Sequence, residues 1–163
     1  MKALLIIVFL ELLLVSAIDL KNKKISNLWF LLNLIIAVVF HFTLKDVFPF
    51  GWENFVFPVG WIAVGFLLFL LKVMGAGDSK YLASLFLMVP AQYHMVLFGK
   101  ILSSTIIVGI ILIMLKIFKD FKKIKAYTLT SYWSGIRETI RSHFSYAPVI
   151  LLAWLLFGAS EWS

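Results

Sequence analysis

Two aspartates stand at the ends of apolar segments of this chain, 59 positions apart. Asp19 closes the first apolar run, just before a group of lysines, and Asp78 lies within Gly75-Ala76-Gly77-Asp78. A carboxylate beside lipid is costly and is usually retained for a function. Two close carboxylates share one proton, so that one can activate a water while the other polarises a carbonyl group. The pair therefore predicts acid–base chemistry on a peptide bond at a membrane surface.

Each aspartate taken alone also has a purely structural interpretation. Asp78 could cap the helix that follows it, and Asp19 could be a solvated charge paired with Lys23. Gly75 and Gly77 lack a β-carbon, so the backbone there can turn sharply or approach a neighbour closely. Finding two such aspartates together favours the catalytic interpretation.

The composition places these residues in a membrane protein. The 163 residues are 63% hydrophobic and 14% charged, with a mean hydropathy of +1.02. No water-soluble domain of this size buries so many apolar side chains. We therefore expect an all-α integral membrane protein with a single domain over residues 1–163. The absence of cysteine excludes disulfides, thiolate nucleophiles and cysteine-ligated zinc.

The apolar runs are continuous, which predicts helices and not the alternating strands of a barrel. We expect six transmembrane helices, over residues 3–18, 28–42, 55–71, 79–89, 95–118 and 144–158. The fourth is short, since the twelve residues from Asp78 to Val89 span about 18 Å of a hydrocarbon core about 30 Å thick. Either this helix continues past a kink at Pro90, or Asp78 lies below the headgroups in a thinned, wet pocket.

The basic residues predict the orientation of the chain. Twelve of the 15 Lys and Arg residues lie in or beside the connections after the first, third and fifth spans, and Lys2, Lys45 and Lys100 lie opposite. These connections are therefore expected in the cytoplasm, with both termini outside. The net charge of +7 needs no nucleic acid to explain it. A signal peptide ending at residues 15–17 is disfavoured because Glu11 interrupts its apolar core.

Other polar residues carry weaker signals. Glu11 is the only acid deep in a span; a structural hydrogen bond is expected, with a substrate-facing or proton-handling role as the alternative. His41, His94 and His143 are far apart in the sequence and do not show the spacing of metal ligands, so no metal is expected. Residues 119–143 could form an amphipathic helix on anionic lipid or an ordinary cytoplasmic loop.

Together these motifs resemble the type IV prepilin peptidases, which are Gly-x-Gly-Asp aspartic proteases of bacterial membranes. The resemblance rests on Asp19 with the following residues 21–28, on Gly75-Ala76-Gly77-Asp78-Ser79-Lys80, and on Tyr146-Ala147-Pro148 at the start of the last span. The family usually has Ile-Pro-Asn where this chain has Ile25-Ser26-Asn27. That difference concerns the local turn and not Asp19.

The resemblance implies that Asp19 and Asp78 are the catalytic dyad and that no cofactor is needed. Gly75, Gly77 and Lys80 would position the motif, while Glu11 and Asn27 would have substrate-binding or structural roles. The alternative is a non-enzymatic membrane component, such as a small transporter or a pilus-assembly subunit, whose carboxylates are structural or handle protons.

The implied substrate is a type IV pilin-like precursor, which loses its short basic leader at the cytoplasmic face of the inner membrane. Larger members of the family add a cytoplasmic domain and methylate the new N-terminus. This chain has neither the length nor the cysteines for that, so it resembles the short branch that serves Flp-type pili. Archaeal preflagellin peptidases are also similar.

Overall fold

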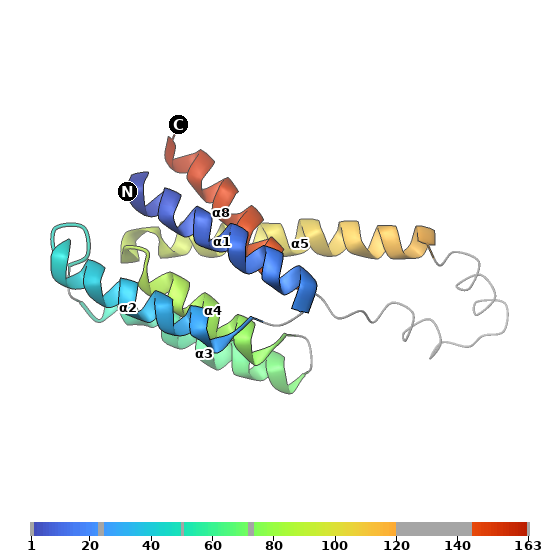
Figure 1. The fold of residues 1–163 in the computed structure, drawn as a ribbon, viewed down its shortest axis with the longest axis horizontal. Helices are drawn as coiled ribbons and strands as arrows, with labels where there is room; N and C mark the ends of the chain where they lie inside the picture. The colour runs from blue at the N-terminus through green and yellow to red at the C-terminus, as the bar shows by residue number, and fades with distance from the viewer. Residues whose placement is uncertain (1, 23–24, 50, 72–73, 120–144, 163) are drawn as a thin grey trace.

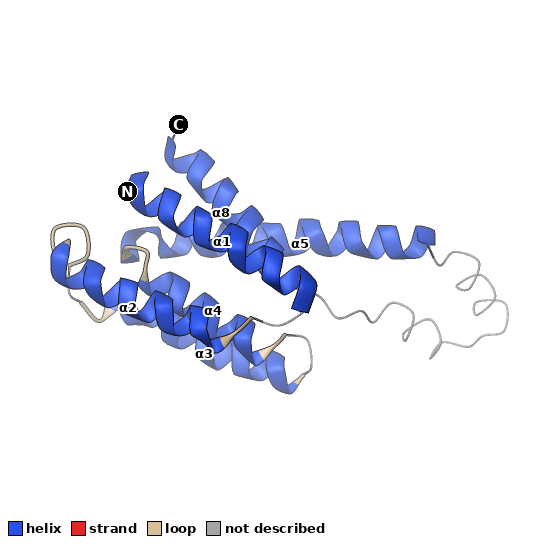
Figure 2. Ribbon diagram, in the orientation of Figure 1, coloured by secondary structure: helices blue, strands red, loops and turns tan. Residues whose placement is uncertain are grey.

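A computed structural model describes residues 2–22, 25–49, 51–71, 74–119 and 145–162 of the chain. Every regular element in this part is helical (Figures 1 and 2). The elements are α1 (Lys2–Asn22), α2 (Asn27–Thr43), α3 (Glu53–Leu70), α4 (Ala76–Leu87), the short 3-10 helix η1 (Ala91–Tyr93), α5 (His94–Lys119) and α8 (Ala147–Trp162). The prediction of an all-α protein is confirmed.

Each predicted span corresponds to one of these α-helices, with ends that differ by a few residues. Among the described residues, two stretches are long and apolar enough to cross a membrane: Glu53–Leu70, and Ala91–Lys119, which consists of η1 and α5. Helix α2 and residues 147–160 of α8 are apolar but shorter. A bundle with six crossings stays a prediction. Most of the 119–143 segment lies outside the described residues.

The helices form two groups that face each other (Figure 1). Helix α4 packs closely against α2 and α3, whereas α8 packs against α1 and α5. The start of α1 and the end of α8 lie at the same end of the bundle, away from the start of α4 (Figure 1). The two predicted catalytic aspartates therefore come from different groups, Asp19 from α1 and Asp78 from α4.

Helix α4 is short, and nearly all of it is buried. Residues 78, 79 and 81–86 are buried, so neighbouring helices cover almost its whole circumference. His94 binds carbonyl groups at the end of α4 and in the turn that follows, since its Nε2 lies 2.8 Å from the oxygens of both Phe86 and Val89. The chain then turns through Pro90 and η1 into α5. Of the two alternatives for this helix, continuation past a kink at Pro90 does not occur, because α4 ends at Leu87.

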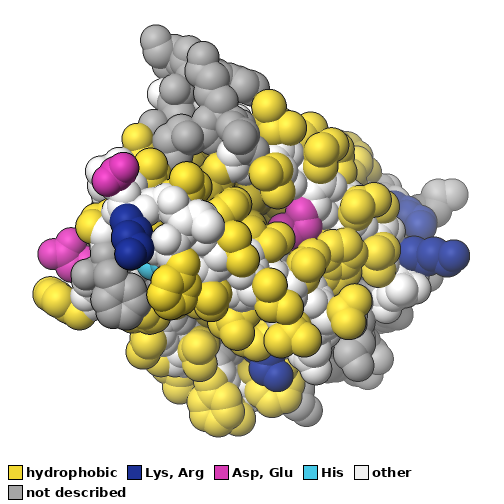
Figure 3. All heavy atoms as spheres, turned by 60° about the vertical axis from the view of Figure 1, so that its left-hand side comes forward, with side chains coloured by type: hydrophobic (Ala, Val, Ile, Leu, Met, Phe, Trp, Pro, Cys, Tyr) yellow, Lys and Arg dark blue, Asp and Glu magenta, His cyan; other side chains and the backbone are white. Residues whose placement is uncertain are grey.

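The outer surfaces of the helices are strongly apolar. Large hydrophobic side chains are exposed along α3, including Val59, Ile62 and Phe66, and along α5, including Ile106, Ile110 and Met114. Figure 3 shows a face covered mainly by hydrophobic side chains, with few charges among them. Such a surface is unusual for a protein in water and is typical of one in lipid.

Candidate active site

Asp19 lies in the last turn of α1 and is only 2% exposed. Its Oδ2 accepts a hydrogen bond of 3.1 Å from the backbone N–H of Ala147, the first residue of α8. Ser145 donates a further bond of 3.3 Å to the backbone carbonyl of Asp19. The carboxylate thus caps the positive end of a helix 128 positions away in sequence.

The sequence contained only an indirect signal for this contact. Pro148 stands in the first turn of α8, as is common at helix starts, but the partner of the helix end could not be inferred. The alternative in which Asp19 pairs with Lys23 lies outside the described residues.

Asp78 lies in the first turn of α4 and is 8% exposed. Its Oδ2 accepts a hydrogen bond of 3.2 Å from the backbone N–H of Gly75. The N-cap position itself belongs to Gly75, so Asp78 is not the N-cap residue that the structural interpretation expected. It folds back onto the start of its own helix, as the acidic member of a capping box does. This bond fixes the carboxylate on the inner side of the helix end.

The two glycines of the motif allow two close approaches. A β-carbon on Gly77 would lie 2.6 Å from the backbone oxygen of Ile25, in the segment that follows Asp19. A β-carbon on Gly75 would lie 3.0 Å from Oδ2 of Asp78. The Gly75–Asp78 turn therefore packs directly on the connection between α1 and α2, and the two sequence motifs meet.

The segments that carry the two carboxylates meet at the contact of Gly77 with Ile25. Tyr146 directly precedes Ala147, whose backbone N–H binds the Asp19 carboxylate. The Tyr146 hydroxyl lies 2.9 Å from Oγ1 of Thr105 on α5. The end of α1 and the starts of α4 and α8 thus converge on one site with two carboxyl groups.

Two other motif residues lie on the surface at this end. Asn27 is exposed at the start of α2. Lys80 is also exposed, and it lines a hollow of about 110 Å³ between α3 and α4 together with Gly65 and Ser79. The contacts of Asp19 and Asp78 described above involve neither residue, so the roles of Asn27 and Lys80 stay predictions.

The replacement of the family's proline by Ser26 has a local explanation. Ser26 is the N-cap of α2, and its hydroxyl accepts a bond of 3.3 Å from the backbone N–H of Leu28. Its φ of −71° is within the range that proline requires. The turn therefore has the backbone that a proline would impose at this position.

Glu11 lies deeper in the bundle than the aspartates. It is 7% exposed, and its Oε1 accepts a hydrogen bond of 3.0 Å from the hydroxyl of Tyr81 on α4. Sequence reasoning singled out Glu11 but not Tyr81, because a tyrosine in an apolar helix has no pattern that marks it as a partner. Among the described residues, no group of three His, Asp or Glu side chains could hold a metal.

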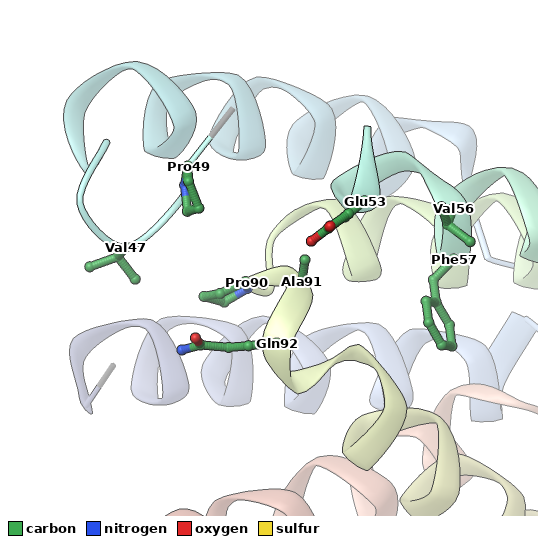
Figure 4. A pocket seen from close by; sticks show the side chains of 8 residues that line it. All are labelled: Val47, Pro49, Glu53, Val56, Phe57, Pro90, Ala91 and Gln92. Atoms are coloured by element: carbon green, nitrogen blue, oxygen red, sulfur yellow. The ribbon is translucent and has the colours of Figure 1, made fainter. Parts of the chain in front are cut away.

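A cavity of about 380 Å³ lies elsewhere in the molecule (Figure 4). It is lined by residues at the start of α3, including Glu53 and Phe57, and by Pro90, Ala91 and Gln92 around η1. These segments are at the opposite end of α4 from Asp78. The cavity is therefore separate from the aspartates.

Comparison with protein families agrees with this arrangement. Residues 6–114 match the type IV leader peptidase family. The chain belongs to this family. The match includes Asp19, the Gly75–Lys80 motif and Glu11, whereas α8 lies outside it. Comparisons with curated proteins and with solved structures gave no match. Membership in the type IV leader peptidase family makes the chain a peptidase, connected with type IV pili and their relatives.

Proposed function

We propose that this chain is a membrane-embedded aspartic endopeptidase that removes the basic leader from type IV pilin-like precursors, with Asp19 and Asp78 as the catalytic pair. The observation that carries the proposal is their convergence. Both side chains are buried, they come from helices in different groups, and their motifs meet at the contact of Gly77 with Ile25 at one end of the bundle. No cofactor is required, because a water and two carboxyl groups suffice.

The chemistry follows from a shared proton. The ionised carboxylate removes a proton from a water, whose oxygen attacks the scissile carbonyl carbon. The protonated carboxyl group donates a hydrogen bond to the carbonyl oxygen. When the C–N bond breaks, a carboxyl group transfers its proton to the departing amine, which is the new N-terminus of the pilin. The proton belongs to the pair, so neither residue is assigned a fixed role.

The hydrogen bonds around the aspartates suit this chemistry. Each carboxylate has one oxygen, Oδ2, bound to a backbone N–H, from Ala147 for Asp19 and from Gly75 for Asp78. These bonds hold both side chains in fixed orientations, which is a requirement for attack by a positioned water. They leave the second oxygen of each residue available for a proton or a water.

We place the site at the cytoplasmic face of the inner membrane, in a protein with six crossings and both termini outside. The apolar outer surface and the distribution of basic residues support this placement. Since α4 has only 12 residues, about 18 Å in length, Asp78 would lie below the headgroup level, in a thinned and wet part of the bilayer. An Flp-type prepilin is the substrate we favour. Family membership supports a peptidase over the non-enzymatic alternative.

A cleavage assay tests the proposal. The chain is co-expressed with an Flp-type prepilin, and the size of the pilin is followed by immunoblot. Wild type should shorten the pilin, while Asp19→Asn and Asp78→Asn should leave it at full length. Each variant keeps the side-chain shape and an oxygen that accepts the backbone N–H bond, so insertion should be retained.

The matched control is Asp46→Asn, the same chemical change at an exposed aspartate between α2 and α3. It should cleave like wild type at equal membrane levels. Cleavage by both active-site variants would exclude the aspartic mechanism. Failure of wild type on a panel of type IV, Flp-type and preflagellin precursors would exclude the peptidase function proposed here.

A further inference from the structure

A buried polar cluster lies inside the bundle, deeper than the two aspartates. Its members are Glu11 on α1, Asn33 on α2, and Tyr81 and Ser84 on α4. All four are buried, and Asn33, Tyr81 and Ser84 have no exposed surface. Polar groups buried at such a depth are costly unless they are hydrogen-bonded. We therefore expect this cluster to have a role beyond filling space in the core.

The hydrogen bonds of the cluster join three helices. Tyr81 donates to Oε1 of Glu11 at 3.0 Å, which links α4 to α1. Asn33 donates to Oγ of Ser84 at 3.3 Å, which links α2 to α4. Ser84 donates to the backbone oxygen of Tyr81 at 2.7 Å, which connects the two bonds within α4.

The Tyr81–Glu11 bond joins the same two helices that carry the aspartates. Tyr81 follows Asp78 by three residues and lies on the same side of α4, while Glu11, Val15 and Asp19 are all buried on the inner side of α1. Helices α1 and α4 belong to different groups, and α4 makes its close backbone contacts with α2 and α3. A long side chain such as tyrosine can span the space between α1 and α4.

We propose that Glu11 and Tyr81 are positioning residues, whose hydrogen bond fixes the rotation and the height of α4 relative to α1 and so sets the spacing of Asp78 from Asp19. This inference rests on the proposed function. A hydrogen bond near the middle of a short helix restricts its translation and rotation relative to the neighbouring helix. A misplacement of about 1 Å at reacting groups can lower a rate by about 100-fold.

Kinetics of a purified enzyme on a prepilin peptide provide the first test. Tyr81→Phe and Glu11→Leu remove the bond and should lower kcat by about tenfold. KM should change little, because both residues are proposed to act through the position of α4 and not on the substrate. Glu11→Gln keeps an oxygen that accepts from Tyr81 and should retain kcat. The double variant Glu11→Leu/Tyr81→Phe should be no slower than the slower single variant, since both remove one interaction.

The matched control is Trp154→Phe. Trp154 donates from Nε1 to the backbone oxygen of Leu5 at 3.0 Å, a buried bond between α8 and α1 that does not involve α4. Its loss should lower the thermal stability without changing kcat. An equal decrease of kcat in Trp154→Phe would show that any lost interhelical bond has this effect, and would overturn the proposal.

Spin-label distances provide a second test that does not depend on cleavage. The chain has no cysteine, so Leu20→Cys on α1 and Ala76→Cys on α4, both exposed, can be labelled selectively. Tyr81→Phe and Glu11→Leu should shift or broaden the distance distribution between the labels, and Glu11→Gln and Trp154→Phe should not. Unchanged distances in Tyr81→Phe and Glu11→Leu overturn the proposal. If no prepilin is cleaved, the proposed function fails, while these distances still decide whether Glu11 and Tyr81 hold α4 in place.

Discussion

The α-carbon of Gly77 lies against the backbone oxygen of Ile25, so closely that a β-carbon would be 2.6 Å away. The two residues are 52 positions apart, one beside Asp78 and the other in the segment that follows Asp19. Since the obstacle is backbone, no rotation of a side chain can relieve the contact. The glycine therefore determines how closely the two motifs approach.

Gly77→Ala should consequently separate the start of α4 from the α1–α2 connection. We expect a loss of about 1–3 kcal/mol of stability from overpacking and strongly reduced cleavage at matched membrane levels. Thermal unfolding, followed by tryptophan fluorescence in detergent, and the immunoblot assay measure the two effects.

Gly60→Ala is the control for this substitution. Gly60 lies inside α3, and a β-carbon added there would meet no described atom of another element within 4 Å. The change should raise stability slightly, because alanine is the better helix former. Similar behaviour of the two alanine variants would contradict the role assigned to Gly77.

Two substitutions of Asp19 should separate its contribution to stability from its contribution to catalysis. Asp19→Ala removes the cap of α8 and should cost about 1 kcal/mol of stability, whereas Asp19→Asn keeps an acceptor for the Ala147 N–H and should cost less. Both should abolish cleavage. Thermal unfolding and cleavage of the two variants, measured in parallel, check this. An Asp19→Asn variant that is stable and active would leave Asp19 with the capping role alone.

Ser26→Pro should be tolerated. The φ of −71° already suits proline. The reduced freedom of the unfolded chain should offset the lost cap of α2, so the net change should stay within about 1 kcal/mol. Ser26→Ala loses the cap without this compensation and should be less stable than Ser26→Pro. The reverse order in thermal unfolding would show that the turn differs from the one described.

His94 should contribute to stability more than to catalysis. Its Nε2 contacts two carbonyl oxygens, so this nitrogen must carry the proton. His94→Phe preserves the ring contacts with Phe57 and Phe86 but leaves the carbonyls of Phe86 and Val89 without this donor. We expect a loss of about 1–3 kcal/mol.

The control for His94 is His41→Phe, a half-buried histidine that contacts one backbone oxygen, that of Ala37. It should lose less stability than His94→Phe. Unfolding temperatures and cleavage rates of the two variants test this together. A large decrease in the cleavage rate of a stable His94→Phe protein would contradict a purely structural role, because His94 lies at the far end of α4 from Asp78.

The sequence predicted the helices well because their apolar runs are long and uninterrupted. For the fourth helix the sequence left open whether it continues past a kink at Pro90, and a local contact decides this. Residues 88–90 and η1 form a turn stabilised by His94, a contact between side chain and backbone that has no periodic signature. The helix therefore stops before Pro90 and does not bend at it.

The candidate site was predictable in its residues but not in its contacts. Asp19 and Asp78 were recognisable because a carboxylate at the end of an apolar run is uncommon. The bonds of Asp19 to Ala147 and of Glu11 to Tyr81 connect positions 128 and 70 residues apart. Only the packing of the helices brings those partners together, and a single sequence does not encode it in a readable pattern.

The composition of α4 also bears on how the protein is made. Its 12 residues include Asp78, Lys80 and two serines, and charged residues oppose the entry of a segment into lipid. Such a segment is a poor substrate for the translocon on its own. In the membrane arrangement proposed here, α4 would enter during synthesis as a hairpin with α3, its closely packed partner, and would complete its burial once the later helices arrive. The same polarity that serves the site would thus impose an order on the biogenesis of the bundle.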